Sequence, residues 1–233
     1  MTLTELPRYE IKVRCPAAIR PEIEAWIRTH WAHWQVRYPP RQVNNIYFDT
    51  PNGAAAKDNL DGVGERRKLR LRWYGPSLKR VTEARLEIKG REGAVSWKMV
   101  YALDVALDLT RQTWPEIRDI LRAAMEPRAA IWLAEMSTPT LISSYWRSYY
   151  STPDGHIRMT LDTALRVYDQ RFWDRPNISS PARFPEIVIM EWKAAAECLP
   201  RLADLLAEFP LRPDRHSKYV QGLLASVNGG EWV

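Results

Sequence analysis

Residues 66–74, RRKLRLRWY, decide the fold class because basic and apolar side chains alternate along them. Successive side chains of an extended strand point to opposite faces, so Lys68, Arg70 and Arg72 share one face. Leu69, Leu71 and Trp73 share the other face. The pattern predicts a β-strand that buries its apolar face. An antiparallel sheet with one hydrated face alternates in the same way, so this strand alone leaves the partner of the basic face open.

The same alternation recurs along most of the chain. Segments with a basic cluster on one face are 8–14, 66–74, 84–90, 141–150, 156–163 and 186–194. Further strands are expected at 43–49, 95–104 and 165–171. Helical spacing of apolar residues predicts helices from Pro21 through Trp31 and Trp34, over 115–133 with a break near Pro127, over 199–209, and from about His216.

These elements predict an α+β fold in a single domain over residues 1–233. Strands and helices do not alternate regularly, which favours an antiparallel sheet over a parallel one. About eight strands suit closure, so we expect an eight-stranded antiparallel β-barrel or tunnel with a few packing helices. The Pro- and Ser-containing segment 172–185 is expected to be an exposed loop.

Closure would bring the basic faces together in one lumen. The residues concerned are Arg8, Lys12, Lys68, Arg70, Arg72, Lys89, Arg147, Arg158 and Lys193. Like charges in a lumen repel unless an anion lies between them. A chain of phosphates carries about one negative charge per unit, and Arg side chains bind phosphate oxygens with two donors at once. The alternation of basic and apolar side chains along these strands therefore indicates a tunnel that binds phosphates.

Composition narrows the class of partner without selecting one. The chain has 34 Lys and Arg residues against 28 Asp and Glu, a net charge of +6, which favours an anionic partner or reflects an ordinary basic protein. Nucleic acid is disfavoured as the partner. Proteins that bind nucleic acid cluster their basic residues on an exposed face, whereas the basic residues of this chain alternate with apolar ones along six strands. The N-terminus lacks a signal-peptide pattern, no apolar stretch could span a bilayer, and only two cysteines occur. A cytoplasmic protein is expected, and its oligomeric state stays open.

Of the carboxylates that share the basic faces, three are candidate ligands of Mg²⁺ or Mn²⁺, which prefer one or two carboxylates plus phosphate oxygens. Glu191 and Glu10 are the first candidates and Glu87 is the third. The alternative is that each neutralises a neighbouring Lys or Arg. Glu191 has the stronger claim because it follows an apolar run, residues 187–190, where a charged side chain needs a reason.

Motifs in chain order add a family resemblance. They are Arg8–Lys12 (RYEIK), Asn45–Thr50 (NIYFDT), Lys68–Gly75 (KLRLRWYG), Glu87–Lys89 (EIK), Tyr145–Tyr149 (YWRSY), Arg158–Thr163 (RMTLDT), Glu191–Lys193 (EWK) and Ser217–Gly222 (SKYVQG). Together they resemble the VTC domain, the polyphosphate polymerase domain within the CYTH-like triphosphate tunnel superfamily. The resemblance implies transfer of the γ-phosphate of ATP onto polyphosphate inside an antiparallel tunnel, with Mn²⁺ or Mg²⁺.

The resemblance also implies roles for individual residues. Catalytic contacts would come from Arg70, Arg72, Lys89, Arg147 and Arg158. Substrate-binding contacts would come from Arg8, Lys12, Lys68, Lys193 and Lys218. The metal would be held by Glu191, with Glu10 beside it.

One departure bears on the reaction. Triphosphatases of the tunnel superfamily typically begin with E-x-E-x-K, and here Arg8 stands at the first Glu position. This favours a polymerase over a hydrolase. A triphosphatase or a non-catalytic polyphosphate-binding module remains the alternative. Neither the SPX domain nor the transmembrane segments of the eukaryotic complex are seen, so a free-standing bacterial type is expected.

Overall fold

The computed structural model describes residues 8–93, 95–209, 211–213 and 217–227, and within them one antiparallel sheet dominates. Eight strands lie in the order β1-β10-β9-β8-β2-β3-β5-β6. Their bounds are β1 Arg8–Pro16, β2 Gln35–Asp49, β3 Glu65–Tyr74, β5 Ala84–Glu92, β6 Val95–Leu103, β8 Thr138–Ser151, β9 Ile157–Asp169 and β10 Ile187–Ala195. The short strands β4 (Arg80–Val81) and β7 (Leu107–Asp108) pair separately.

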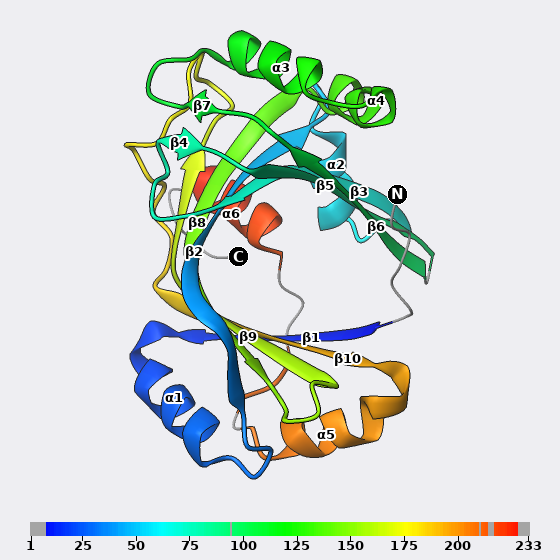
Figure 1. Cartoon of the computed structure of the whole chain (residues 1–233), viewed down its shortest axis with the longest axis vertical. Helices are drawn as coiled ribbons and strands as arrows, with labels where there is room; N and C mark the ends of the chain where they lie inside the picture. The colour runs from blue at the N-terminus through cyan, green and yellow to red at the C-terminus, as the bar shows by residue number, and fades with distance from the viewer. Residues whose placement is uncertain (1–7, 94, 210, 214–216, 228–233) are drawn as a thin grey trace.

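The long sheet bends strongly, so that β3, β5 and β6 on one side face β1 and β10 on the other (Figure 1). The helices are α1 Arg20–Thr29, α2 Ala54–Leu60, α3 Trp114–Ala123, α4 Pro127–Glu135, α5 Leu199–Ala207 and α6 Lys218–Val227. Two of them, α3 and α4, cover one end of the bent sheet, and α1 and α5 cover the opposite end. Helix α6 lies inside the bend (Figure 1). None of the helices in the described ranges is long and apolar enough to cross a bilayer.

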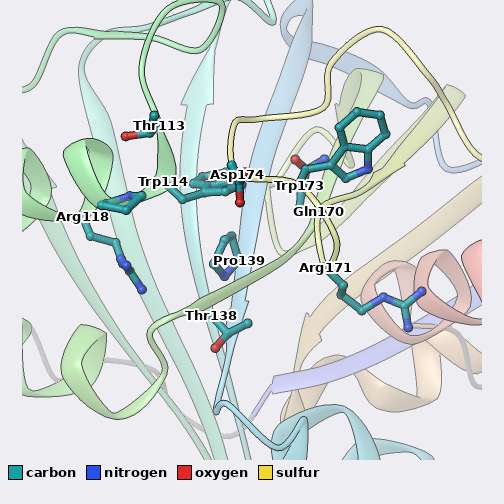
Figure 2. Close-up of a pocket in the computed structure, with 10 residues that line it drawn as sticks. Thr113, Trp114, Arg118, Thr138, Pro139, Gln170, Arg171, Trp173 and Asp174 are labelled. Atoms are coloured by element: carbon teal, nitrogen blue, oxygen red, sulfur yellow. The ribbon is translucent and has the colours of Figure 1, made fainter.

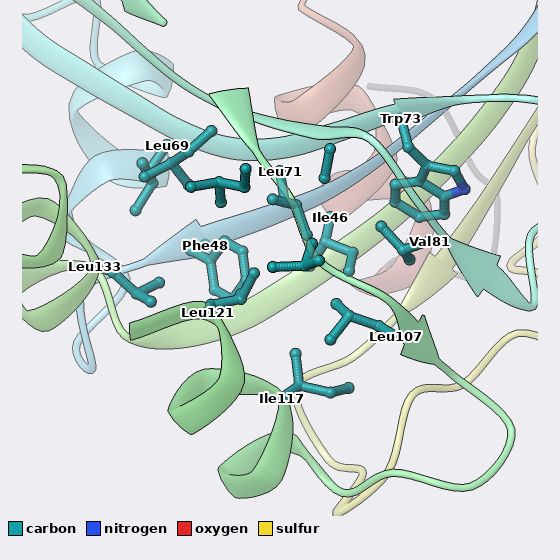
Figure 3. Close-up of a cluster of buried hydrophobic side chains, with 14 of the residues drawn as sticks. Ile46, Phe48, Leu69, Leu71, Trp73, Val81, Leu107, Ile117, Leu121 and Leu133 are labelled. Carbon is teal, nitrogen blue, oxygen red and sulfur yellow. The ribbon is translucent and has the colours of Figure 1, made fainter. Parts of the chain in front are cut away.

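The apolar faces of the strands form cores on the convex side. Leu69, Leu71 and Trp73 of β3 are almost fully buried against α3 and α4, where they meet Ile117 and Leu121 (Figure 3). Burying each such side chain contributes roughly 1.5–3 kcal/mol to folding. This packing fixes which face of β3 lies against the helices, and it leaves the basic residues of β3 on the concave side.

A second convex core joins β1, β9 and β10 to α1 and α5. Val13, Met190 and Trp192 are buried there with Ile27 and Leu205. The same strands therefore turn Lys12, Glu191 and Lys193 the other way, because their side chains alternate. Both convex cores thus direct charged residues toward the space between the two walls.

Helix α6 packs into part of the concave side, against β8 and β9. The Tyr219 ring stacks on Tyr47 at 4.9 Å, and its hydroxyl donates to Asp49 over 2.6 Å. Gly222 allows this close approach, since a Cβ there would lie 2.5 Å from the Leu141 side chain. The helix occupies one region of the concave face and leaves the charged residues beside it.

The predicted α+β class and the antiparallel eight-stranded sheet are confirmed, and one feature of closure differs. In the described part of the chain, β1 and β6 are the two edges of the sheet, and backbone pairing does not join them. The walls instead meet through side chains: Lys89 Nζ of β5 lies 3.3 Å from Glu10 Oε2 of β1. The sheet is therefore open in the described residues, and an ion pair between β5 and β1 links its two walls.

Some boundaries differ from the sequence predictions. The expected strands 156–163 and 165–171 are one strand, β9, which passes through Ala164 at φ 52° beside a register shift in β8. Helix α1 ends at Thr29, so Trp31 and Trp34 follow it rather than extend it. Helix α2 was not predicted.

Segment 172–185 is irregular, as predicted, but it is tied to the sheet. The Ala182 amide donates to the Val167 carbonyl over 2.9 Å, and the buried Asn177 amide donates to the Gln170 side chain over 2.8 Å. The beginning of this segment and the start of α3 line a pocket of about 390 Å³, where Trp173 and Trp114 are seen (Figure 2). Its lining contains none of the charged residues of the concave face.

Candidate functional site

On one wall of the concave face, Glu87 of β5 binds three basic side chains. Arg70 donates from Nε and Nη2 to Glu87 Oε2 over 2.8 and 2.5 Å. Arg72 Nη1 and Lys98 Nζ lie 3.7 and 3.3 Å from Oε1. Burial raises the pKa of Glu87, but Arg70, Arg72 and Lys98 outweigh it and hold the pKa below its ordinary value. This wall therefore keeps an excess of positive charge.

The opposite wall holds two carboxylates and two lysines. Lys193 Nζ lies 2.8 Å from Glu191 Oε1, and Lys12 Nζ lies 2.5 Å from Glu10 Oε1. Burial and Glu191 raise the pKa of Glu10, yet Lys12, Lys193 and Lys89 lower it to about 2. Burial also raises the pKa of Glu191, and Lys193 and Lys12 bring it well below the ordinary value. Both carboxylates are ionised near neutral pH.

A third cluster joins the sheet to α6. Asp162 of β9 is fully buried and accepts from Arg147 Nε and Nη2 over 2.6 and 2.7 Å. Lys218 Nζ, at the start of α6, lies 2.6 Å from the second oxygen of the same carboxylate. The Tyr145 ring lies beneath both cations, 5.3 Å from the Arg147 guanidinium and 5.0 Å from Lys218 Nζ. The position of α6 is thereby tied to the charged face.

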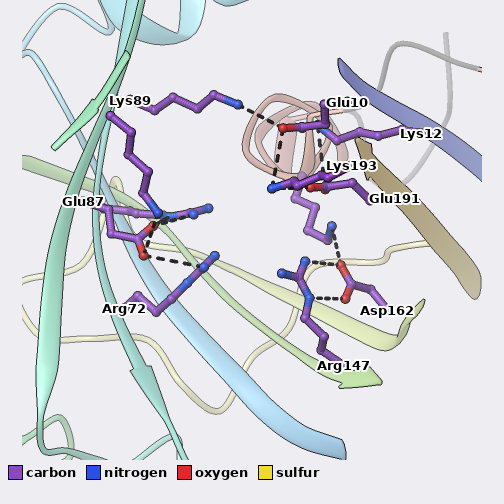
Figure 4. A network of polar contacts seen from close by, with 12 residues as sticks. Glu10, Lys12, Arg72, Glu87, Lys89, Arg147, Asp162, Glu191 and Lys193 are labelled. Carbon is purple, nitrogen blue, oxygen red and sulfur yellow. Dashed lines mark hydrogen bonds and ion pairs between the residues drawn. The ribbon is translucent and has the colours of Figure 1, made fainter. Parts of the chain in front are cut away.

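Together these side chains form what we call the concave network. Its members are Lys12, Lys68, Arg70, Arg72, Lys89, Lys98, Arg147, Lys193, Lys218, Glu10, Glu87, Asp162 and Glu191. Figure 4 shows Glu87 and Arg72 projecting from one wall toward Glu191, Lys193 and Asp162 on the other. The named cations outnumber the carboxylates by nine to four. Such an excess favours an anion between the walls.

Lys68 shows this excess most clearly. Its ammonium donates to Ser217 Oγ over 2.9 Å, and among the described residues it has no carboxylate partner within ion-pair distance. Burial lowers the pKa of Lys68, and Lys12, Lys89, Arg66 and Arg70 lower it further, to about 7. A bound anion would restore its charge, so Lys68 would take up a proton on binding above pH 7.

We expect Lys68→Met to stabilise the ligand-free protein at pH 6 by roughly 1–3 kcal/mol, because the buried charge is removed. Between about pH 7 and the unfolded value of 10.5, the unfolded chain binds more protons than the folded protein. Wild-type stability should therefore rise with pH across this window, and the advantage of Lys68→Met should shrink. Urea unfolding at pH 6 and pH 9 measures both. Lys57→Met, at an exposed position of α2, is the control; an equal pH dependence in wild type and Lys68→Met would contradict the prediction.

The structure brings most of the predicted site residues onto one face, and their roles stay predictions. Arg158 lies beside Lys193 in the sheet register, on the same face. The Arg8 side chain falls outside the described residues. The expected start of the last helix, near His216, is outside the described ranges.

Two members were missed as site residues. Lys98 is the only basic residue of β6, so it produced no repeating pattern, and its place follows from its register with Lys89. Asp162 shared a face with Arg158 in the sequence pattern but was given no role. Its partner Arg147 lies on the neighbouring strand β8, and only the strand pairing reveals the contact.

The donors present suit a hard divalent cation. Glu10 and Glu191 lie on adjacent strands and the same face, close enough for Glu191 to raise the pKa of Glu10. Two carboxylates that complete their coordination with substrate phosphates match the preference of Mg²⁺ and Mn²⁺. Within the described residues no cluster of three His, Cys, Asp or Glu side chains could form a complete protein cage. Phosphate oxygens would have to supply the remaining ligands.

Comparisons with known proteins agree with this geometry. A family model, the VTC domain, matches residues 7–227. A putative adenylyl cyclase from Hippeastrum, HpAC1, described as having a dominant triphosphatase activity, has a similar structure with a TM-score of 0.53 and 17% identity. The match covers 97% of this chain and 98% of that chain, and it shows a shared fold.

Two further solved structures match more weakly. A putative adenylate cyclase from Vibrio parahaemolyticus matches with a TM-score of 0.47 and 14% identity, over 94% of this chain and 98% of that chain. PH1819 from Pyrococcus horikoshii OT3 matches with a TM-score of 0.47 and 11% identity over the same shares. No curated protein matches the chain in sequence.

Proposed function

Because the chain belongs to the VTC domain family, we propose that it is a polyphosphate polymerase that transfers the γ-phosphate of ATP onto a growing polyphosphate chain. The observation that supports this most is the concave network, in which basic side chains from both walls and from α6 surround one space with too few carboxylates to neutralise them. A linear polyanion complements such a surface along its whole length.

The proposed roles follow from position. Arg70 and Arg72 on one wall and Arg147 on the other would hold the transferring phosphoryl group between them and offset its charge. Lys12, Lys68 and Lys193 would bind the neighbouring phosphates and keep the reacting oxygens in line. Arg158 and Lys89 would extend the row of contacts, and Lys218 would add the cation at the start of α6.

A Mg²⁺ or Mn²⁺ ion held by Glu191 and Glu10 would supply charge neutralisation on the phosphate oxygens. The lysines that now contact these carboxylates, Lys193 and Lys12, are well placed to turn to phosphate instead. Lys193 and Lys12 thus have two alternative partners, the carboxylates of Glu191 and Glu10 or the phosphates of a substrate.

The proton balance supports transfer to phosphate. A terminal phosphate is already anionic near neutral pH, so it needs no general base. The carboxylates of the network have lowered pKa values: Lys12 and its neighbours hold Glu10 at about 2 despite burial, and Lys193 and Lys12 keep Glu191 low in the same way. Such groups are poor bases for activating water. The replacement of the first Glu of the triphosphatase motif by Arg8 agrees with this.

Hydrolysis of triphosphates is the second candidate, favoured by the triphosphatase activity described for the similarly folded Hippeastrum protein. Incubating the purified protein with ATP and Mn²⁺ or Mg²⁺ separates the two. A polymerase forms ADP and long polyphosphate, which is seen as a ladder on a gel. The phosphate gained by the polyphosphate equals the ADP formed. ADP with orthophosphate alone would instead identify a triphosphatase. Binding without turnover under either metal would identify a binding module.

A further inference from the structure

The first half of β2 carries an exposed group of aromatic and arginine side chains. The Arg41 guanidinium lies 4.0 Å from the Tyr74 ring centroid and 5.0 Å from that of Tyr149, and Arg41 Nε donates to the Tyr149 hydroxyl over 3.0 Å. The Tyr38 ring meets Tyr149 edge-on at 5.7 Å. We call these four residues the Arg41 cluster. None of them belongs to the concave network.

The cluster lies next to the network on the same face. Arg41 is the register partner of Arg147 across β2 and β8. Tyr149 follows Arg147 by two residues, which keeps both on one face of β8 about 7 Å apart. Tyr74 stands two residues beyond Arg72 on β3, again on the face of the network. The aromatic residues Tyr74 and Tyr149 thus lie directly beside Arg72 and Arg147, two of the candidate phosphate-binding residues.

Tyr38, like Arg41, is exposed to solvent. Its side chain is 48% exposed, and β2 shifts register with β8 on both sides of it, before Tyr38 and again before Arg41. Two prolines, Pro39 and Pro40, restrict the backbone between those shifts. The contacts among Arg41, Tyr74 and Tyr149 support the Tyr38 ring, which is exposed rather than packed into a core, and the Arg37 guanidinium also lies against it, 5.6 Å from the ring centroid.

We propose that the Arg41 cluster is the site for the nucleobase of a nucleoside triphosphate, with the Tyr38 ring stacking on the base. The proposal rests on the proposed function, because it assumes that the phosphates lie along the concave network. Aromatic side chains beside a basic row are the combination that binds bases and phosphates together, and stacking accepts any base.

This assignment separates the donor from the acceptor. ATP carries a base and polyphosphate does not, so only ATP would gain affinity from Tyr38. The cluster would place ATP with its base at this end of the network and its γ-phosphate directed along the basic row. Inorganic polyphosphate would depend on the lysines and arginines alone.

The test compares two ligands on four proteins. Dissociation constants for ATP and for inorganic tripolyphosphate are measured by calorimetry, with the same Mg²⁺ concentration, for wild type, Tyr38→Ala, Tyr38→Phe and Tyr9→Ala. Tyr38→Ala should weaken ATP about tenfold, as expected for the loss of one stacked base, and change tripolyphosphate less than twofold. Tyr38→Phe keeps the ring and should keep the affinity for ATP. Tyr9 is 46% exposed on β1 and faces away from the network, so Tyr9→Ala should change neither ligand.

The outcomes separate this inference from the proposed function. Equal losses of ATP and tripolyphosphate in Tyr38→Ala, or no loss of either, would overturn the base site and leave the phosphate tunnel standing. Failure of wild type to bind either ligand would overturn the proposed function and the base site with it. Circular dichroism of Tyr38→Ala excludes a folding defect as the cause of lost affinity.

Discussion

Replacing Glu191 with glutamine should lower the rate of polyphosphate synthesis by at least about 100-fold, the scale expected when a metal-holding carboxylate is lost. The substitution keeps the shape of the side chain and removes the negative charge, so Lys193 and Lys12 lose one anion and stay available for phosphate. Affinity for tripolyphosphate without metal should therefore remain within a few-fold of wild type, or increase. Rates of ADP formation and metal-free calorimetry measure the two effects.

Metal dependence tests the role of Glu191 more closely. If the carboxylate holds the ion, Glu191→Gln should need a higher Mn²⁺ concentration for half-maximal rate, which a purely structural loss would not produce. Glu186→Gln, at an exposed position just before β10, is the matched control and should retain wild-type activity. Unchanged synthesis in Glu191→Gln would rule out this carboxylate as a metal ligand.

Replacing Asp162 with asparagine should lower the free energy of unfolding of the ligand-free protein by roughly 3–5 kcal/mol, the usual cost of leaving a buried ion-pair partner uncompensated. Arg147 and Lys218 would both lose their carboxylate, at 2.6–2.7 Å in the native protein. The same excess of positive charge should increase affinity for tripolyphosphate. Saturating tripolyphosphate should therefore restore much of the lost stability.

Denaturant unfolding with and without tripolyphosphate measures this balance, and Asp204→Asn on the exposed face of α5 is the control. A pH series adds a second check. Burial raises the pKa of Asp162, but Arg147 and Lys218 outweigh it and hold the pKa below 3.8, so its contribution is present above about pH 3.8 and is lost as the pH falls below. Stability that is unchanged in Asp162→Asn, or not recovered with ligand, would contradict the assignment of Arg147 and Lys218 to anion binding.

Periodicity predicted which residues face inward because burial of the alternate side chains is local information. Once Leu69 and Leu71 are assigned to a core, Lys68 and Arg70 must face the other way. The pairing of charges was not predictable in the same way. Glu10 and Lys193 lie opposite each other in the sheet although nearly the whole chain separates them in sequence. That contact depends on the strand order, which alternation does not encode.

Helix α2 shows a second limit. Its sequence, AAAKDNL, follows a turn signal, and the usual capping position holds Gly53 without a side-chain cap. The free amides of its first turn are instead bound by Asp49, which accepts from Ala55 and Ala56 over 2.9 Å. Asp49 belongs to the preceding strand, so the residue that caps the helix lies several positions before the N-cap residue, where a sequence pattern would be expected to show it. The same carboxylate accepts from Tyr219 and anchors α6.

The open edge between β1 and β6 bears on how wide the channel can become. In a closed barrel the number of strands and their stagger fix the diameter. In the described part of this chain, Lys89 of β5 and Glu10 of β1 join the two walls as a partly exposed ion pair, and such pairs contribute only about 0–1 kcal/mol. The ion pair therefore adds little resistance to a change in the distance between the two walls. The two walls are joined through β9, β8 and β2, so a ligand of different width would be accommodated by bending this sheet, without breaking backbone hydrogen bonds between β1 and β6.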